Sequence, residues 1–253
     1  MKMKYLVNTL ANSIREPAEM DLNYSKPSGI LKIVDDNKYF IVPFIVLFTL
    51  TMTLLWFIGN NRLFLDANKI HFEFADLIFP YLTNFGDGII AIIFVTILLW
   101  VSFREALTFL ILTIVLAILV NLLKNDFFPD YDRPVWYFGA SALHLIPGYD
   151  PPLLHTFPSG HTVTAFSVCL YLSFLINQKM IKFVLFFLAV IIGYSRIYLC
   201  AHFPFDVAIG ALISVVITTL IYHQSLNIKN HWIDKSLKLK MNFLPDCKIY
   251  VIL

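Results

Sequence analysis

The chain has 253 residues, of which 58% are hydrophobic and only 14% are charged. This composition is too apolar for an ordinary soluble domain, and the length suits one compact membrane domain. The net charge of +2, without a basic cluster interleaved with aromatic residues, argues against a nucleic-acid partner. The three cysteines show no spacing typical of a metal site or of a disulfide framework.

The first third of the chain contains one predicted membrane span between two more polar segments. Residues 1–38 are mixed in character, and either a short helix lying on the membrane or a loosely ordered tail fits them. Residues 39–59 form an apolar run with the length, about 20 residues, that crosses a bilayer. Residues 60–87 mix aromatic and acidic side chains, which indicates an interfacial segment with a short amphipathic helix.

Five further apolar runs follow along the chain. The first two of these are separated by Arg104 and Glu105, which we expect to mark a tight turn. Residues 125–157 contain five prolines, so they cannot form one continuous helix. The six predicted spans are residues 39–59, 88–103, 106–123, 161–176, 183–198 and 207–222.

These runs predict an all-α fold, an integral membrane bundle of six helices with short interfacial helices. We divide the chain into an N-terminal segment (1–38), a six-span domain (39–223) and a C-terminal tail (224–253). With six spans both tails lie on one side, and that side then holds fourteen of the 19 Lys and Arg residues. Because positive charge is enriched on the cytoplasmic side, we expect both tails in the cytoplasm.

Polar residues are concentrated where the fifth span meets the sixth. Close together in the sequence lie Arg196, His202 and Asp206. Charged residues at the end of a membrane helix are costly, so they usually serve a function. Arg196 can hold phosphate through two parallel hydrogen bonds. Asp206 could orient the His202 imidazole if a helix begins here, and Pro204 fits its first turn. For these residues alone, an interfacial turn with snorkelling side chains is an equal alternative.

Two other polar stretches favour a functional site. Pro158-Ser159-Gly160-His161 opens the fourth span, and Lys124 ends the third, with Arg133 and Pro134 in the following loop. Together the three stretches resemble the signature of the type-2 phosphatidic acid phosphatase superfamily: Lys-x6-Arg-Pro, Pro-Ser-Gly-His and Ser-Arg-x5-His-x3-Asp. The second and third parts match throughout, whereas eight residues rather than six separate Lys124 from Arg133. The predicted topology places all three parts on one face of the membrane.

The resemblance implies a role for each matching residue. His202 would be the nucleophile that forms a phosphohistidine, and Asp206 would hold its ring in the correct tautomer. His161 would be the acid for the leaving group and then the base for water. The residues implied to hold the phosphate are Lys124, Arg133, Ser159, Gly160 and Arg196. No metal and no cofactor are implied, since the cationic side chains do the work of a metal.

Two of these residues also have simpler explanations. Lys124 could be a snorkelling lysine at a helix end, because the longer first part weakens its match. Ser159 could be an N-cap residue, a role that it can combine with phosphate binding.

The implied function is hydrolysis of the phosphate or diphosphate of a membrane lipid, such as undecaprenyl diphosphate, phosphatidylglycerol phosphate, phosphatidic acid or a lipid A phosphate. The expected partners are that lipid and the bilayer, without nucleic acid and without an obligatory protein partner. We expect a bacterial inner-membrane protein whose site faces the periplasm or exterior. A lipid phosphotransferase of the same family and a non-catalytic transporter of an anionic lipid are the alternatives.

Overall fold

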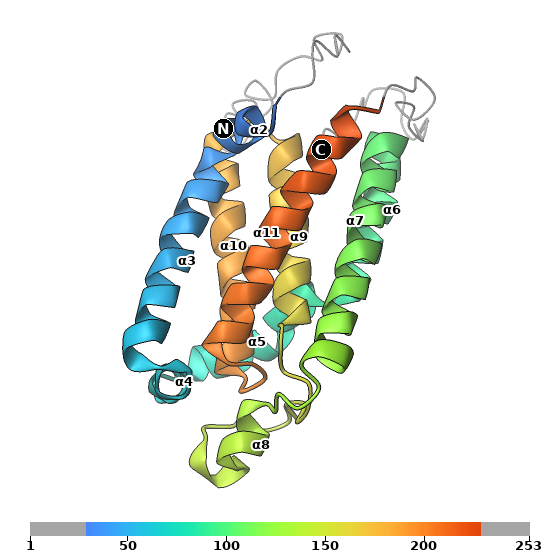
Figure 1. The fold of residues 1–253 in the computed structure, drawn as a ribbon. Coiled ribbons are helices and arrows are strands. Elements are labelled where there is room, and N and C mark those ends of the chain that lie inside the picture. Colours follow the sequence, from blue (N-terminus) through green and yellow to red (C-terminus); the bar gives the residue numbers. More distant parts are fainter. Residues whose placement is uncertain (1–28, 229–253) are drawn as a thin grey trace, which may run out of the picture.

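A computed structural model describes residues 29–228, and in that range every regular element is a helix (Figure 1). The all-α prediction is therefore confirmed for these residues. Two 3₁₀ turns, Thr83–Gly86 and Ala140–Ala142, and a π turn, Leu123–Phe127, lie between the α-helices. The α-helices are α2 (Ile30–Asp36), α3 (Lys38–Ile58), α4 (Asn60–Asn68), α5 (Glu73–Leu82), α6 (Gly88–Val101), α7 (Phe103–Leu122), α8 (Pro134–Phe138), α9 (Gly160–Leu175), α10 (Lys179–Tyr198) and α11 (Pro204–Leu226).

Each predicted span coincides with one of these helices, namely α3, α6, α7, α9, α10 and α11. Four of them, α3, α7, α10 and α11, are long and apolar enough to cross a membrane. Helix α6 meets that criterion only together with α5 and the 3₁₀ turn before it, and this pair is bent by 55°. Helix α9 is apolar but has only 16 residues. The segment 60–87, predicted to hold one short interfacial helix, forms both α4 and α5.

The two ends of the described chain lie at the same end of the bundle, as an even number of crossings requires (Figure 1). Helices α4, α5 and α8 lie at the opposite end. The expected surface helix near the N-terminus and the lysines of the C-terminal tail fall within residues 1–28 and 229–253, outside the described residues.

Helix α9 lies at the centre of the bundle, where it packs against α6, α7, α10 and α11. On one side of it a core cluster contains Phe40, Phe166 and Phe186. On the other side Phe109 lies edge-to-face between Phe94 and Tyr171, with ring centroids 4.7 and 5.0 Å apart. Aromatic pairs prefer this geometry. The helix that begins with Gly160 and His161 is therefore fixed from several directions.

The outer surface of the bundle is apolar. Large hydrophobic side chains are exposed along α3, α6, α7 and α10, and Trp56 at the end of α3 is 85% exposed. A continuous apolar surface of this extent would make a soluble monomer aggregate, whereas lipid chains solvate it without cost. Together with the long apolar helices, this surface identifies a membrane protein.

The predicted turn at Arg104 and Glu105 was misplaced. Helix α6 ends at Val101 and α7 begins at Phe103, so the chain turns at Ser102, whose hydroxyl accepts a hydrogen bond from the Glu105 N–H at 3.1 Å. Arg104 lies in the first turn of α7, where it is buried and donates to the Ser225 carbonyl at 2.6 Å. An N-cap serine can reverse the chain without a charged turn.

Helix α11 approaches the start of α9 so closely that only glycine fits at position 210. A Cβ atom there would lie 2.9 Å from the Ser159 carbonyl oxygen, which is backbone and cannot rotate away. We predict that Gly210→Ala lowers the free energy of unfolding by about 1–3 kcal/mol, the usual effect of overpacking. The matched control is Gly88→Ala, because a Cβ at Gly88 meets no atom within 4 Å. Thermal unfolding in detergent measures both, and equal midpoints would contradict the prediction.

Candidate active site

The three signature stretches meet at the end of the bundle that carries α4, α5 and α8. Lys124 lies in the π turn that continues α7, Arg133 precedes α8, and Ser159 precedes α9. Arg196 lies in the last turn of α10, and Asp206 lies in the first turn of α11 with Pro204 as its first residue. The loop between α10 and α11 contains His202. Helix ends that are far apart in sequence thus contribute to one polar cluster.

His202 is the most enclosed member of this cluster, with 1% of its surface exposed. Its backbone N–H donates to the Arg196 carbonyl at 3.1 Å, which ties the loop to the end of α10. Its Nε2 atom lies 3.3 Å from Nη1 of Arg133. On its Nε2 side the imidazole therefore faces a guanidinium and not a carboxylate.

The other ring nitrogen of His202 faces Thr156 and Asp206. Nδ1 lies 3.2 Å from the Thr156 hydroxyl and 3.7 Å from Oδ2 of Asp206. The Thr156 hydroxyl donates to the same Oδ2 at 2.5 Å, and the Phe203 N–H donates to it at 2.9 Å. The family resemblance implied that Asp206 holds the ring in the correct tautomer. In the structure a threonine hydroxyl lies between the two.

Arg133 is 8% exposed and fixed by backbone carbonyl groups. Its guanidinium donates to the carbonyl oxygens of Leu154 at 2.7 Å, Ala201 at 3.0 Å and His155 at 3.3 Å. Lys124 donates to the same His155 oxygen at 3.2 Å. One backbone oxygen therefore holds the two cations of the first signature part side by side, so Lys124 does more than snorkel to the interface.

The longer spacing between Lys124 and Arg133 has a local structural counterpart. The Phe128 N–H donates to the Leu123 carbonyl at 2.9 Å, five residues back, which closes a π turn. Such a turn contains one residue more than an α turn. It therefore accommodates one of the two extra residues before the loop begins, and Lys124 remains within reach of the site.

Arg196 approaches from the opposite side. Its Nη1 donates to the Thr83 hydroxyl at 2.6 Å and to the Tyr149 hydroxyl at 3.1 Å. Its Nε is buried and has no hydrogen-bond partner among the described residues. A buried charged donor without an acceptor costs free energy, so this atom favours a bound anion.

The start of α9 provides His161, and there the backbone of the 3₁₀ turn Thr83–Gly86 lies close to the backbone of α9. A Cβ at Gly86 would lie 2.8 Å from the His161 carbonyl oxygen, so only glycine lets the 3₁₀ turn before α6 reach this position. The Ser159 hydroxyl accepts from the backbone N–H and the hydroxyl of Thr162, at 3.4 and 2.8 Å. Ser159 is thus an N-cap, as its alternative explanation requires, and the positive end of the α9 dipole faces the site.

The charges of the cluster act on His202. Burial holds its pKa well below the ordinary value of 6.5, and Arg133, Arg196, Lys124 and His161 lower it further. Burial also lowers the pKa of Arg133 to about 10, with Arg196 as the next cause, so Arg133 stays protonated at neutral pH. The site therefore combines a neutral imidazole with cations that can neutralise an anion.

Comparison with known proteins agrees with this geometry. A family model described as the PAP2 superfamily matches residues 105–229, which contain all three stretches. The crystal structure of Aquifex aeolicus LpxE is similar, with a TM-score of 0.58 and 29% sequence identity over 64% of this chain and 94% of that chain. This chain belongs to the PAP2 superfamily.

Two curated proteins resemble shorter parts of this PAP2 chain. A lipid A 4'-phosphatase of Porphyromonas gingivalis is 28% identical over 80 residues, which are 32% of this chain and 34% of that protein. A bacitracin transport permease protein, BcrC, of Bacillus licheniformis is 38% identical over 68 residues, 27% of this chain and 32% of that protein. The matches therefore span about a third of the length of each curated relative.

Several residues of this PAP2 site were not identified from the sequence. Thr83 and Thr156 are fully or nearly fully buried and hydrogen-bond to Arg196 and Asp206, but a single threonine outside a motif gives no signal. Tyr149 accepts a hydrogen bond from Arg196 at the site, and a single tyrosine in a loop rich in aromatic residues gives no signal either. Only the fold brings these side chains to the signature residues.

The unpartnered Nε of Arg196 predicts anion binding that can be measured without turnover. Inorganic phosphate at 100 times its Kd should stabilise the protein by about 2.7 kcal/mol. Arg196→Gln should weaken phosphate binding by at least about tenfold, since hydrogen bonds to charged groups contribute about 1.5–3 kcal/mol. The control is Arg62→Gln, because Arg62 is exposed and pairs only weakly with Asp66, at 3.8 Å. Equal phosphate-dependent shifts of the thermal midpoint in the two variants would refute this assignment.

Proposed function

We propose that this protein is a metal-independent phosphatase that hydrolyses the phosphate or diphosphate of a membrane lipid through a phosphohistidine at His202. One observation carries the proposal. A buried, neutral imidazole lies with its Nε2 atom 3.3 Å from a guanidinium, in the middle of a cluster of cations. A site that only binds anions gains nothing from a neutral nucleophile at its centre.

In the first step the Nε2 lone pair of His202 attacks phosphorus, and the bond from phosphorus to the lipid oxygen breaks. Arg133, Arg196 and Lys124 neutralise the charge on the phosphoryl oxygens, which is the main catalytic requirement of phosphoryl transfer. Asp206 stabilises the positive charge that develops on the imidazole. The departing alkoxide takes a proton from His161.

In the second step water attacks the phosphorus of the phosphohistidine, and the nitrogen–phosphorus bond breaks. His161, now without its proton, accepts one from the water as it attacks. Inorganic phosphate leaves, and the His202 imidazole is neutral again. The backbone at the start of α9, with Ser159 as its N-cap, contributes the positive end of a helix dipole.

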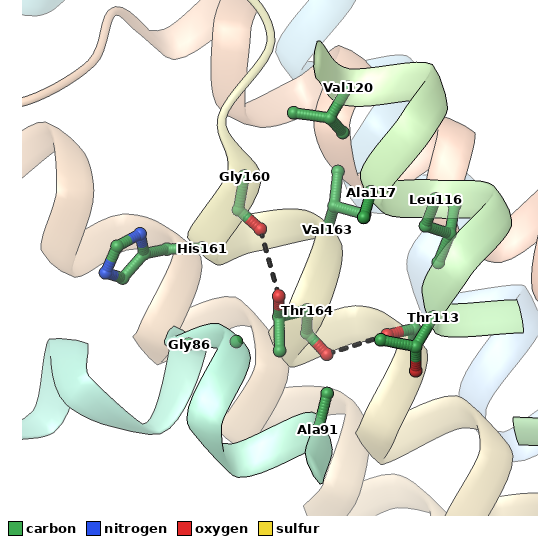
Figure 2. Close-up of a pocket in the computed structure, with 12 residues that line it drawn as sticks. Gly86, Ala91, Thr113, Leu116, Ala117, Val120, Gly160, His161, Val163 and Thr164 are labelled. Carbon is green, nitrogen blue, oxygen red and sulfur yellow. Dashed lines mark hydrogen bonds between the residues drawn. The ribbon is translucent and has the colours of Figure 1, made fainter. Parts of the chain in front are cut away.

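An apolar pocket beside His161 supports a lipid as the substrate. This pocket has a volume of about 270 Å³ and extends from His161 between α6, α7 and α9 (Figure 2). Much of its lining is small, with Gly86, Gly88, Ala91 and Ala117. In Figure 2 the His161 side chain lies at one edge and points away from the α7 residues. An apolar chain in this pocket would bring its phosphate to the cations.

The proposed arrangement in the membrane follows from the same features. All six helices α3, α6, α7, α9, α10 and α11 cross the bilayer, and the short α4, α5 and α8 lie in the interface. The distribution of Lys and Arg supports termini in the bacterial cytoplasm and a site on the periplasmic or exterior face. There the site meets lipid headgroups directly.

Among lipid phosphates, the similar proteins give some support to particular candidates. A lipid A 4'-phosphatase is similar to part of this chain, which favours the lipid A class among the candidates. The similarity to a transport permease protein favours the alternative of an anionic-lipid transporter, which would bind the lipid without releasing phosphate. A phosphotransferase would need a second lipid as acceptor.

The proposed function predicts release of inorganic phosphate by purified protein in detergent, without an added acceptor and in the presence of chelator. The panel contains a lipid A phosphate, undecaprenyl diphosphate, phosphatidylglycerol phosphate and phosphatidic acid. His202→Ala should abolish release, and His223→Ala, at the other end of α11, should not. Release that depends on an added acceptor lipid would indicate the phosphotransferase, and binding without release would indicate the transporter.

A separate prediction tests the division of labour between the two histidines. A lipid alkoxide needs a proton when it leaves, whereas p-nitrophenolate does not. General-acid catalysis contributes about 10²–10⁴-fold, so His161→Ala should lose this factor on a lipid phosphate and little of it on p-nitrophenyl phosphate. His202→Ala should lose both activities equally. Single-turnover formation of the phosphoenzyme is the measurement, because His161 also acts in the second step. Equal losses for both substrates in His161→Ala would remove its role as the acid.

A further inference from the structure

The position of the proton on His202 follows from its neighbours. On the Nε2 side the partner is Nη1 of Arg133, at 3.3 Å, and a guanidinium can only donate hydrogen bonds. The Nε2 atom must therefore present its lone pair. In a neutral imidazole the single proton is then on Nδ1.

The partner of that proton is Thr156 rather than Asp206. The distance from Nδ1 to Oδ2 of Asp206, 3.7 Å, is too long for a hydrogen bond, whereas the Thr156 hydroxyl oxygen lies at 3.2 Å. Thr156 has one hydroxyl proton and gives it to Asp206 across 2.5 Å. Its lone pair is thus available to accept from Nδ1–H.

The reverse direction of these two hydrogen bonds, from Asp206 through Thr156 to His202, is excluded at both residues that it joins. It would require Nδ1 without a proton, and so an N–H on Nε2 directed at the donors of Arg133. It would also require Asp206 to donate through Oδ2, which already accepts from the Phe203 N–H at 2.9 Å. Only the order Nδ1–H to Thr156 to Asp206 satisfies every donor and acceptor.

We propose that Thr156 is a positioning residue for His202: its hydroxyl accepts from Nδ1–H, in the tautomer that Arg133 sets, and transmits the charge of Asp206 to the ring. Its catalytic consequence rests on the proposed function. Thr156 is fully buried, so its hydroxyl has no contact with solvent. Its backbone N–H donates to the Tyr131 carbonyl at 2.9 Å, next to the loop that holds Arg133. This backbone hydrogen bond therefore links Thr156 to the loop that contains Arg133, so the two partners of the imidazole are held relative to each other.

The test compares Thr156→Val, which has the same shape without the hydroxyl, with Thr156→Ser, which keeps it. Partners that orient metal-bound imidazoles contribute about 10–100-fold, and by analogy Thr156→Val should lose a factor of this size in kcat. KM should change by less than about threefold, since the phosphate-binding cations are unchanged. Thr156→Ser should retain most of the activity.

Thr218→Val is the matched control. Thr218 is also fully buried, and its hydroxyl has no partner among the described residues, so its loss should not change kcat. If Thr156→Ser is as impaired as Thr156→Val, the methyl group is what matters and the proposal is wrong. Wild-type kcat in Thr156→Val would overturn it equally.

A second measurement does not require activity. Nitrogen NMR of protein labelled at histidine distinguishes protonated from unprotonated ring nitrogens, and the signals of His202 are those absent from His202→Gln. We expect protonated Nδ1 and unprotonated Nε2 in the wild type and in Thr156→Ser, and a changed Nδ1–H signal in Thr156→Val, where the hydrogen-bond acceptor of that proton is gone. An Nε2–H tautomer in the wild type would overturn the proposal even if the enzyme is active. Absence of phosphate release from the whole panel would instead refute the proposed function and leave this measurement valid.

Discussion

The arrangement of this end of the molecule depends on the repulsion among Lys124, Arg133 and Arg196. Three cations that share one cluster repel each other, and burial makes that repulsion stronger than in water. Asp206 is the acidic side chain that hydrogen-bonds within the cluster, through Thr156. Further compensation comes from oxygen dipoles, namely the backbone carbonyls around Arg133 and the two hydroxyls that accept from Arg196. The loops are shaped to supply those oxygens.

The need to bring several helix ends into one cluster also explains the close contacts between helices. The start of α9 must enter a crowded region, and it does so because Gly86 and Gly210 let the neighbouring backbone come within a distance that no side chain would permit. Aromatic packing on both sides of α9 then keeps that helix in place. The rigidity of the polar end thus originates in the apolar middle of the bundle.

The all-α fold could be predicted because helices of this length have a simple physical signal, whereas the motif residues followed from the family resemblance, since an interfacial turn explained Arg196, His202 and Asp206 equally well on their own. Apolar runs of helical length predict the helices, and charged residues at the ends of such runs are costly unless they function. The prediction of a turn at Arg104 was wrong because Ser102 caps the helix without any charged residue. Arg104 instead donates a hydrogen bond to the carbonyl of Ser225, far away in the sequence. Thr156 and Thr83 could not be predicted, since their importance comes from three-dimensional proximity alone. The π turn at Lys124 is likewise invisible in composition.

The carbonyl group of His155 has a consequence for any anion that enters the cluster. His155 has a left-handed backbone conformation, with φ of 55°, and its oxygen accepts from Lys124 and Arg133 together. A resident acceptor thus competes with the incoming one for the same two donors. Binding becomes an exchange of partners, so its net free energy is smaller than the sum of the new contacts. The reverse exchange offers these donors a ready replacement when the anion departs, which favours rapid release over tight retention.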